Sequence, residues 1–266
     1  MSAVYRPSLL RRGADWFDLY LDGVYQALKT AAPYSRGRLL DVGCGTKPYQ
    51  RFFESYVSAY VGVEYGDTFA LTQDSNAAGR PDFYYDGTRL PFDDGSFQTV
   101  LSVSVLEHTP EPQSLFAEMA RVLEPGGTMI QLVPFSFRLH EEPHDYYRFS
   151  PHALRHMCEL NGLEVLEIGS HGSLWSIVGQ KLVTHLVFSV SRLGGLAQSL
   201  GKLGFEKARS EKVRPWTLPI TIPSAAVLVA GTKALERIAP TRDDALGFFL
   251  IARKQSPVQA AETSVN

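Results

Sequence analysis

Two glycines in the first fifth of the chain lie in a pattern that suits ligand binding. The short apolar run Arg38–Val42 (RLLDV) contains Asp41 and is followed directly by Gly43, Cys44 and Gly45. Glycine has no Cβ, so a strand that ends in this turn lets a ligand approach the main chain closely. The same glycines could form a structural turn in any α/β protein, so the pattern needs support from other residues.

The spacing of a second acidic residue supplies that support. Glu64 ends the apolar run 60–64 (YVGVE), 23 residues after Asp41. A doubly wound fold has a carboxylate at this place, where it accepts hydrogen bonds from ribose hydroxyls. Pro48 replaces the last small residue of a dinucleotide-binding turn, and Asp41 suits an ammonium group better than a pyrophosphate. We therefore expect a positively charged nucleoside, and the alternative of an NAD-dependent oxidoreductase is disfavoured.

Residues 140–150 (HEEPHDYYRFS) concentrate polar and aromatic side chains. The first five match the HExxH string of zinc proteases, which binds metal only on a continuous helix. Pro143 disfavours that helix, so we expect no metal ion. Two interpretations stay open. Either a loop at the ligand-binding edge uses His144 as a general base with Asp145 orienting it, or a lid is held by an Arg148–Asp145 pair.

Other histidines have simpler explanations. Glu107 and His108 follow an apolar run, and a structural role in pinning the adjacent loop competes with catalysis. His152 and His156 lie one turn apart on an expected surface helix, where a solvent-exposed role is the default.

Alternating strands and helices must position these groups. Apolar runs predict strands at residues 38–42, 60–64, 82–85, 98–103, 128–133, 163–168 and 246–252. Apolar spacing and capping signals predict helices at residues 15–32, 112–123 and 150–161. Near-continuously apolar strands between helices indicate a mostly parallel sheet covered on both faces. Tyr5, Trp16 and Tyr20 in the N-terminal region either cap the ligand pocket or pack in the core.

Four segments, in order, resemble the motifs of class I S-adenosylmethionine-dependent methyltransferases. They read LLDVGCGTKPY (39–49), VGVE (61–64), YYDGTRLPFDDGSFQTVLSVSVLEHTPEP (84–112) and VLEPGGTMI (122–130), and the later HDYYRFS is similar to a segment common in family-11-type members. The resemblance covers about residues 36–170. It implies an α/β fold with a doubly wound seven-stranded sheet of order 3-2-1-4-5-7-6, the last strand antiparallel and helices on both faces.

The resemblance also implies S-adenosylmethionine as cofactor, together with the residues that contact it. The methionine moiety would lie along the glycine turn, the ribose at the acidic end of the second strand, the adenine at the third strand and the sulfonium at the fourth. The implied residues are Asp41, Gly43, Cys44 and Gly45 for the methionine moiety and Glu64 for the ribose. For the adenine they are Asp86 and Gly87, and for the sulfonium Ser102 and Val103.

About 70 residues between the last two expected strands do not fit the α/β pattern. We expect an N-terminal helical cap at 1–35, a core at 36–172 and 243–254, an apolar, basic helical insertion at 173–242 and a disordered tail at 255–266.

Most of the insertion has a net positive charge, whereas the rest of the chain has a net negative charge. Residues 173–237 hold nine lysines and arginines against three glutamates, a net charge of +6, whereas the whole chain carries −2 and the remainder therefore −8. The insertion either shapes the acceptor pocket or a dimer contact, or it rests on an anionic membrane surface. Three prolines within residues 215–232 argue against a transmembrane helix.

Composition narrows the function further. The 266 residues carry a near-neutral net charge, so we expect no nucleic-acid partner. The sequence has no long apolar segments of the kind that a multi-span membrane protein needs. Two cysteines outside any CxxC pair and no signal-like start predict a cytoplasmic protein, or one peripheral at the inner membrane surface. We expect methyl transfer to oxygen or nitrogen of a small-molecule or glycan- or lipid-linked acceptor. The alternative is a regulatory or scaffold subunit that binds the nucleoside without catalysis.

Overall fold

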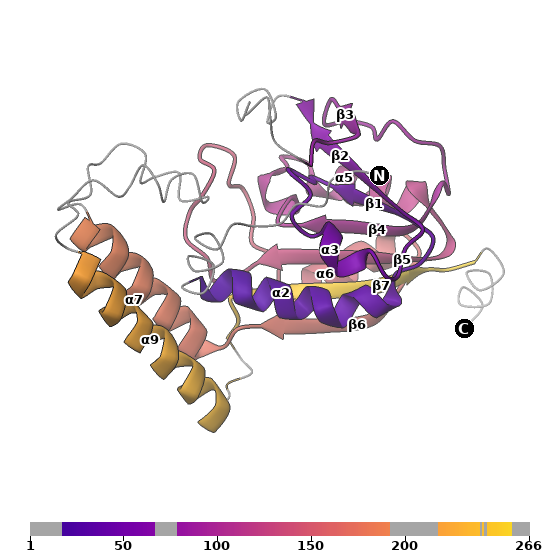
Figure 1. Cartoon of the computed structure of the whole chain (residues 1–266). Helices are drawn as coiled ribbons and strands as arrows, with labels where there is room; N and C mark the ends of the chain where they lie inside the picture. Colours follow the sequence, from indigo (N-terminus) through magenta and orange to yellow (C-terminus); the bar gives the residue numbers. More distant parts are fainter. Residues whose placement is uncertain (1–17, 67–78, 192–217, 240, 242–243, 257–266) are drawn as a thin grey trace.

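A seven-stranded sheet forms the centre of the molecule (Figure 1). The computed structural model describes residues 18–66, 79–191, 218–239, 241 and 244–256. The sheet has the order β3-β2-β1-β4-β5-β7-β6. Its strands are β1 (Arg38–Val42), β2 (Ala59–Tyr65), β3 (Phe83–Tyr85), β4 (Phe97–Val103), β5 (Leu123–Pro134), β6 (Leu163–His171) and β7 (Gly247–Lys254).

Strand β7 runs antiparallel to both of its neighbours, β5 and β6, whereas β1 to β5 pair in parallel. The predicted strand order and the antiparallel last strand are therefore confirmed. The apolar runs form strands because both of their faces are buried, and β4 has only one residue that is not fully buried.

Helices cover both faces of the sheet, as predicted. On one face, α5 (Pro112–Val122) and α6 (Pro151–Leu160) pack against the sheet around Phe116 and Leu154. On the other face, α2 (Leu19–Ala31) and the short α3 (Gln50–Phe53) pack around Leu28 and Phe53. Burial of these apolar stripes is the main stabilising contribution of such helices. The described residues also include the 3₁₀ turns η1 (Ala32–Tyr34) and η2 (Leu106–His108).

Local capping explains where two of the helices begin. The Asp18 carboxylate accepts hydrogen bonds from the N–H groups of Tyr20 and Leu21, so α2 begins at Leu19. Residues before Asp18, including Tyr5 and Trp16, lie outside the described residues. The Ser150 hydroxyl accepts a hydrogen bond at the start of α6, which confirms the predicted Ser-Pro helix start.

Strand β5 begins five residues earlier than the apolar run 128–133 predicts. Leu123 already pairs with Phe97 of β4, and the register then shifts before Thr128 pairs with Thr99. The Pro-Gly-Gly segment at 125–127 therefore lies inside an irregular strand that begins directly after α5.

The predicted insertion contains two long helices that lie side by side and extend beyond the sheet, α7 (Leu174–Ser191) and α9 (Leu218–Ile238) (Figure 1). Ile177 and Val229 pack together there with Leu19 of α2, and Lys233 pairs with Asp22 at 2.9 Å. These contacts attach the helix pair to α2, at one end of the sheet.

No helix in the part of the chain that the structure describes is long and apolar enough to cross a membrane. Six of the nine basic residues within 173–237, those at 192–214, lie outside the described residues, as does most of the tail after 254. The domain boundaries and the membrane-surface contact therefore stay predictions.

Candidate functional site

The glycine turn lies at the carboxyl end of β1, between β2 and β4, where the direction of strand order reverses. Gly43 and Gly45 both have positive φ angles, +72° and +49°, which residues with a Cβ rarely adopt. A Cβ on Gly43 would lie 2.3 Å from Val105, whereas a Cβ on Gly45 would meet no atom of the described structure within 4 Å. Gly43 thus allows close packing, and the described residues leave open space beside Gly45, in which a ligand can lie.

Two buried carboxylates flank this turn. Glu64, at the end of β2, accepts hydrogen bonds from the N–H groups of Gly45 at 2.7 Å and Tyr65 at 3.0 Å, and burial raises its pKa. Asp41 accepts a hydrogen bond from the Tyr60 hydroxyl at 2.6 Å, and burial raises its pKa to about 7. Both predicted residues therefore lie at the turn, and Tyr60 is a contact that the sequence motifs did not indicate.

The turn also contains a buried lysine that sequence reasoning missed. Lys47 has a φ of +55° and a side chain only 4% exposed, and its Nζ lies 2.5 Å from Asp82 Oδ2. The same Asp82 oxygen accepts the N–H of Gly62 at 2.7 Å, so the pair ties the turn to β2. The neighbouring Cys44 is buried, and burial raises the pKa of its thiol, so it packs as an apolar group.

The other predicted cofactor residues end neighbouring strands at the same edge. Asp86 follows β3 and accepts hydrogen bonds from the Thr88 hydroxyl and N–H, which lower its pKa. Gly87 has a φ of +87°. Ser102 and Val103 are buried at the end of β4, and the Ser102 Oγ has no hydrogen-bond partner among the residues described. An unpartnered buried hydroxyl is costly, which fits a site completed by a polar ligand.

Helix α2 contributes Tyr20 to this edge. Ser104, directly after β4, has a φ of +55°, and its Oγ lies 2.9 Å from the Tyr20 hydroxyl. The Tyr20 ring also stacks near Phe137, with centroids 4.6 Å apart, and near His171 at 5.1 Å. Tyr20 therefore packs with aromatic neighbours and also presents its hydroxyl next to the end of β4.

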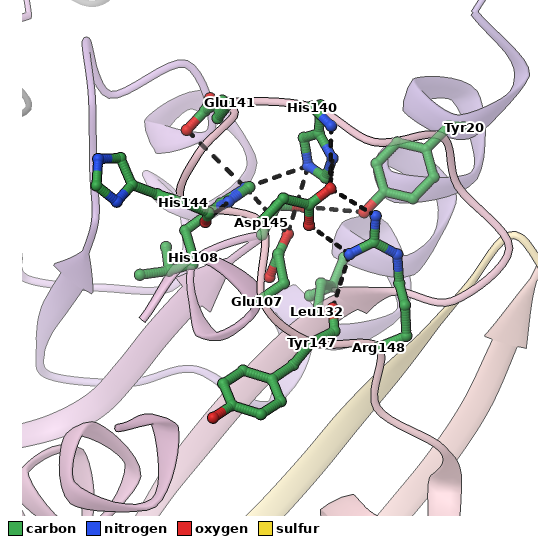
Figure 2. A network of polar contacts seen from close by, with 12 residues as sticks. Tyr20, Glu107, His108, Leu132, His140, Glu141, His144, Asp145, Tyr147 and Arg148 are labelled. Carbon is green, nitrogen blue, oxygen red and sulfur yellow. Dashed lines mark hydrogen bonds and ion pairs between the residues drawn. The ribbon is translucent and has the colours of Figure 1, made fainter. Parts of the chain in front are cut away.

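Residues 140–150 form a loop, so the HExxH string does not lie on a helix, as Pro143 predicts. Arg148 donates two hydrogen bonds to Asp145, at 2.5 and 2.8 Å, which confirms the predicted ion pair. Asp145 does not orient His144 as expected. Its Oδ2 instead accepts the His140 N–H at 3.0 Å and lies 3.3 Å from His140 Nδ1. The His144 ring contacts the Tyr146 hydroxyl at 3.0 Å and points away from the other histidines (Figure 2).

Three side chains converge beneath this loop: Glu107, His108 and His140 (Figure 2). The Nε2 atoms of the two histidines are 3.1 Å apart, and Glu107 Oε1 lies 3.7 Å from His108 Nε2 and 3.9 Å from His140 Nε2. The Glu107 side chain is fully buried, and burial raises its pKa to about 8. Burial also lowers the pKa of His140 to about 4.

Glu107 also has the structural role that was one of its two predicted alternatives. Its backbone oxygen accepts the N–H groups of Tyr146 at 2.8 Å and Tyr147 at 3.3 Å, which holds the loop over η2. The sequence carried no sign that His140 joins Glu107 and His108, because 32 residues separate the two histidines.

A cavity of about 290 Å³ lies elsewhere, between α2, β6 and α9. His171, Ser176 and Glu236 contribute to its wall, and none of the predicted cofactor residues does. We therefore assign the candidate site to the carboxyl edge of the sheet, where the glycine turn and the loop meet, and not to this cavity.

Comparisons with known proteins give a family match for part of the chain. Residues 40–131 match the family model described as a methyltransferase domain. An uncharacterized methyltransferase of Mycobacterium sp. (strain JLS) is 37% identical over 107 residues, which cover 40% of this chain and 42% of the relative. One from Mycobacterium tuberculosis (strain ATCC 25618 / H37Rv) is 37% identical over 94 residues, 35% of this chain and 37% of the relative. The matched region thus spans less than half the length of these relatives.

Solved structures share the fold at low identity. An S-adenosylmethionine-dependent methyltransferase from Mesorhizobium loti has a TM-score of 0.52 at 13% identity, covering 88% of this chain and 99% of that one. A chain from the complex between the Trm112 methyltransferase activator and a methyltransferase of Haloferax volcanii has a TM-score of 0.51 at 19% identity, covering 92% and 93%. The sequence match, the strand order and the fold thus agree: residues 40–131 match a methyltransferase domain, and the chain has the class I S-adenosylmethionine-dependent methyltransferase fold.

Proposed function

We propose that the protein transfers a methyl group from S-adenosylmethionine to an oxygen or nitrogen atom of a small-molecule or glycan- or lipid-linked acceptor. The observation that carries this proposal is the open space at Gly45, beside the buried Glu64, within the segment that matches methyltransferase domains. In open α/β sheets this reversal of strand order is the usual place for a nucleoside ligand.

Each cofactor residue has a distinct task in this proposal. The backbone at Gly43, Cys44 and Gly45 lies along the methionine moiety, and Asp41 supplies negative charge for its ammonium group. Glu64 accepts hydrogen bonds from the ribose hydroxyls in exchange for its present bonds to the Gly45 and Tyr65 N–H groups.

Three further positions complete the cofactor site. Asp86 and Gly87 border the adenine, and Ser102 with Val103 borders the sulfur. The Ser102 hydroxyl is suited to this position because it is buried without a partner in the described structure.

When bound, S-adenosylmethionine supplies a methyl group on a positively charged sulfur that needs little further activation. Transfer joins the acceptor atom to the methyl carbon and breaks the carbon–sulfur bond, whose electron pair stays on sulfur, while the acceptor gives up a proton. The protein's main contribution is therefore to align the two reactants and exclude water. Tyr20 and the loop at 140–150 border the acceptor side.

His144, which the sequence suggests as the general base, is the residue that we propose to take the proton from the methyl acceptor. The His144 imidazole lies on the loop, but Asp145 does not orient it, because Asp145 contacts His140 and Arg148 instead. A base must reach the proton that it removes, and loop side chains often do so only in the complex with substrate.

Two measurements on the full chain test the proposal. Calorimetric titration with S-adenosylhomocysteine is expected to show one site per chain, and NAD is expected not to bind. Incubation of the protein with methyl-labelled S-adenosylmethionine and cell extract is then expected to release S-adenosylhomocysteine and label an acceptor. Nucleoside binding without turnover would instead indicate the regulatory or scaffold subunit, and absence of nucleoside binding would overturn both functions.

A further inference from the structure

Two histidine rings face each other in a way that hydrogen bonding between neutral rings does not explain. His108 Nδ1 lies 2.9 Å from the backbone oxygen of His144, and His140 Nδ1 lies 3.1 Å from that of Arg138. A carbonyl oxygen only accepts hydrogen bonds, so each Nδ1 carries the ring hydrogen. Both Nε2 atoms then present lone pairs, although they are 3.1 Å apart. Two acceptors at this distance need a cation between them.

Glu107 adds an anionic oxygen to the same point. Its side chain is fully buried, and no other residue in the described ranges donates a hydrogen bond to either carboxylate oxygen. An ionised carboxylate buried with no donor and with two nitrogen lone pairs beside it is strongly unfavourable unless a proton or a metal ion compensates it. The three groups therefore share one requirement, which a single metal ion would meet.

The spacing of the three atoms has the size of a metal site. The sides of the triangle are 3.1, 3.7 and 3.9 Å. A point equidistant from its corners lies about 2.1 Å from each, which is close to zinc–nitrogen and zinc–oxygen bond lengths of about 2.0–2.2 Å. The donors thus require no large rearrangement to bind one ion.

The surroundings of the histidines also match a metal site. Metal-binding histidines usually donate their second N–H to a backbone carbonyl or carboxylate, which sets the tautomer and the ring orientation. His140 has both kinds of partner, since its Nδ1 lies 3.1 Å from the Arg138 oxygen and 3.3 Å from Asp145 Oδ2. The ion pair with Arg148 fixes Asp145 in turn, and Glu141 brings a further carboxylate within 3.9 Å of His108 Nε2 (Figure 2).

We propose that Glu107, His108 and His140 bind one divalent metal ion of the class that favours imidazole ligands, represented by Zn²⁺. Two nitrogens and one carboxylate oxygen select such an ion over Mg²⁺ or Ca²⁺, which prefer oxygen ligands. Three protein ligands are typical of catalytic zinc sites, which keep one coordination position open. If the proposed methyl transfer holds, that position suits an oxygen or nitrogen of the acceptor. The metal site itself does not depend on that function.

Metal binding is measured on the full chain after chelator treatment, with no nucleoside present. Calorimetric titration with ZnCl₂ is expected to show one ion per chain, and MgCl₂ is expected to show no binding at the same concentrations. Co²⁺ is expected to give visible absorption that Zn²⁺ abolishes. Absence of Zn²⁺ binding would overturn the proposal and would leave a proton shared by the two rings as the cation.

Matched variants locate the site. Glu107→Gln and His140→Gln are each expected to weaken Zn²⁺ binding by more than about 100-fold, and Asp145→Asn, which weakens the contacts of Asp145 with His140 and Arg148, by about 10-fold. His156→Gln is the control, because this exposed histidine lies in α6 next to Glu159. Unchanged affinity in both Glu107→Gln and His140→Gln would overturn the assignment.

Thermal unfolding shows whether each variant is folded and whether Zn²⁺ stabilises it. Zn²⁺ is expected to raise the Tm of the wild-type protein and of His156→Gln, but not that of Glu107→Gln. A Tm increase of the same size in Glu107→Gln would contradict the assignment. S-adenosylhomocysteine affinity, measured separately, shows whether the cofactor site is intact, so failure of the metal proposal is distinguishable from failure of the proposed function.

Discussion

The Nε2 atoms of His108 and His140 lie 3.1 Å apart, although η2 and the loop after β5 are distant in the sequence. The loop reaches this position because the backbone oxygen of Glu107 accepts the N–H groups of Tyr146 and Tyr147. One residue, Glu107, thus holds the loop with its main chain and turns its carboxylate toward the histidines that the loop brings together.

Gly45→Ala tests the nucleoside site. Alanine at a positive φ is strained, so we expect a loss of stability of about 1 kcal/mol. The new methyl group would also enter the open space, so S-adenosylhomocysteine affinity is expected to fall at least about 10-fold, a change of about 1.4 kcal/mol. Calorimetric titration and urea unfolding measure the two effects.

Gly162→Ala is the matched control for this prediction. Gly162 has a φ of +63°, and a Cβ there would also meet nothing within 4 Å in the described structure. It is therefore expected to lose similar stability but to keep full nucleoside affinity. Equal affinities of the two variants would place the nucleoside away from the glycine turn.

Asp41 predicts a pH dependence of stability. Burial raises its pKa to about 7 from an unfolded value near 3.8, so between these two values the folded state binds more protons than the unfolded state. Stability is therefore expected to fall as pH rises from about 4 to 7, by up to about 4 kcal/mol from this one group. Asp41→Asn removes the penalty, so its Tm advantage over the wild type is expected to grow between pH 5 and pH 8.

Glu54→Gln serves as the control in the pH experiment, because Glu54 is exposed at the end of α3. Its Tm difference from the wild type is expected to stay constant over the same range. A constant difference for Asp41→Asn as well would show that Asp41 is ionised in the folded protein across the whole range.

Lys254 predicts a purely structural effect. Its Nζ donates hydrogen bonds to the backbone oxygens of Ala120 and Leu123, both at 2.7 Å, at the junction of α5 and β5. Lys254→Met keeps the apolar stem but leaves these oxygens without the charged donor, so we expect a loss of about 1–3 kcal/mol in urea unfolding. Lys29→Met, at an exposed position in α2, is expected to change little. A large loss of S-adenosylhomocysteine affinity in Lys254→Met would contradict a structural role.

His144→Ala tests the base suggested by the sequence. Removing a general base is expected to lower methyl transfer in the extract assay by about 10²-fold or more, with S-adenosylhomocysteine affinity unchanged. His152→Ala, at an exposed position in α6, is the matched control. Undiminished transfer by His144→Ala would reject this residue as the base and direct attention to the His108–His140 pair.

The fold could be predicted in large part because its signals are local. Strand β1 has the bounds predicted from its apolar run, and Ser150 with Pro151 marks the start of α6. A buried strand must be apolar on both faces and a helix must cap its first N–H groups, and both requirements are written in neighbouring residues. The glycine turn followed from the same logic, since positive φ angles at Gly43 and Gly45 need residues without a Cβ.

The sequence by itself thus determined the order of the elements, the glycine turn and its acidic partners at Asp41 and Glu64. Only the tertiary structure decided which side chains meet across segments: Asp145 with His140 instead of His144, and His140 with His108 and Glu107. The physical reason is that backbone periodicity and capping act over a few residues. The pairing of loop side chains depends instead on the path that the chain takes after β5 and on rotamers selected by packing, and no local pattern encodes these.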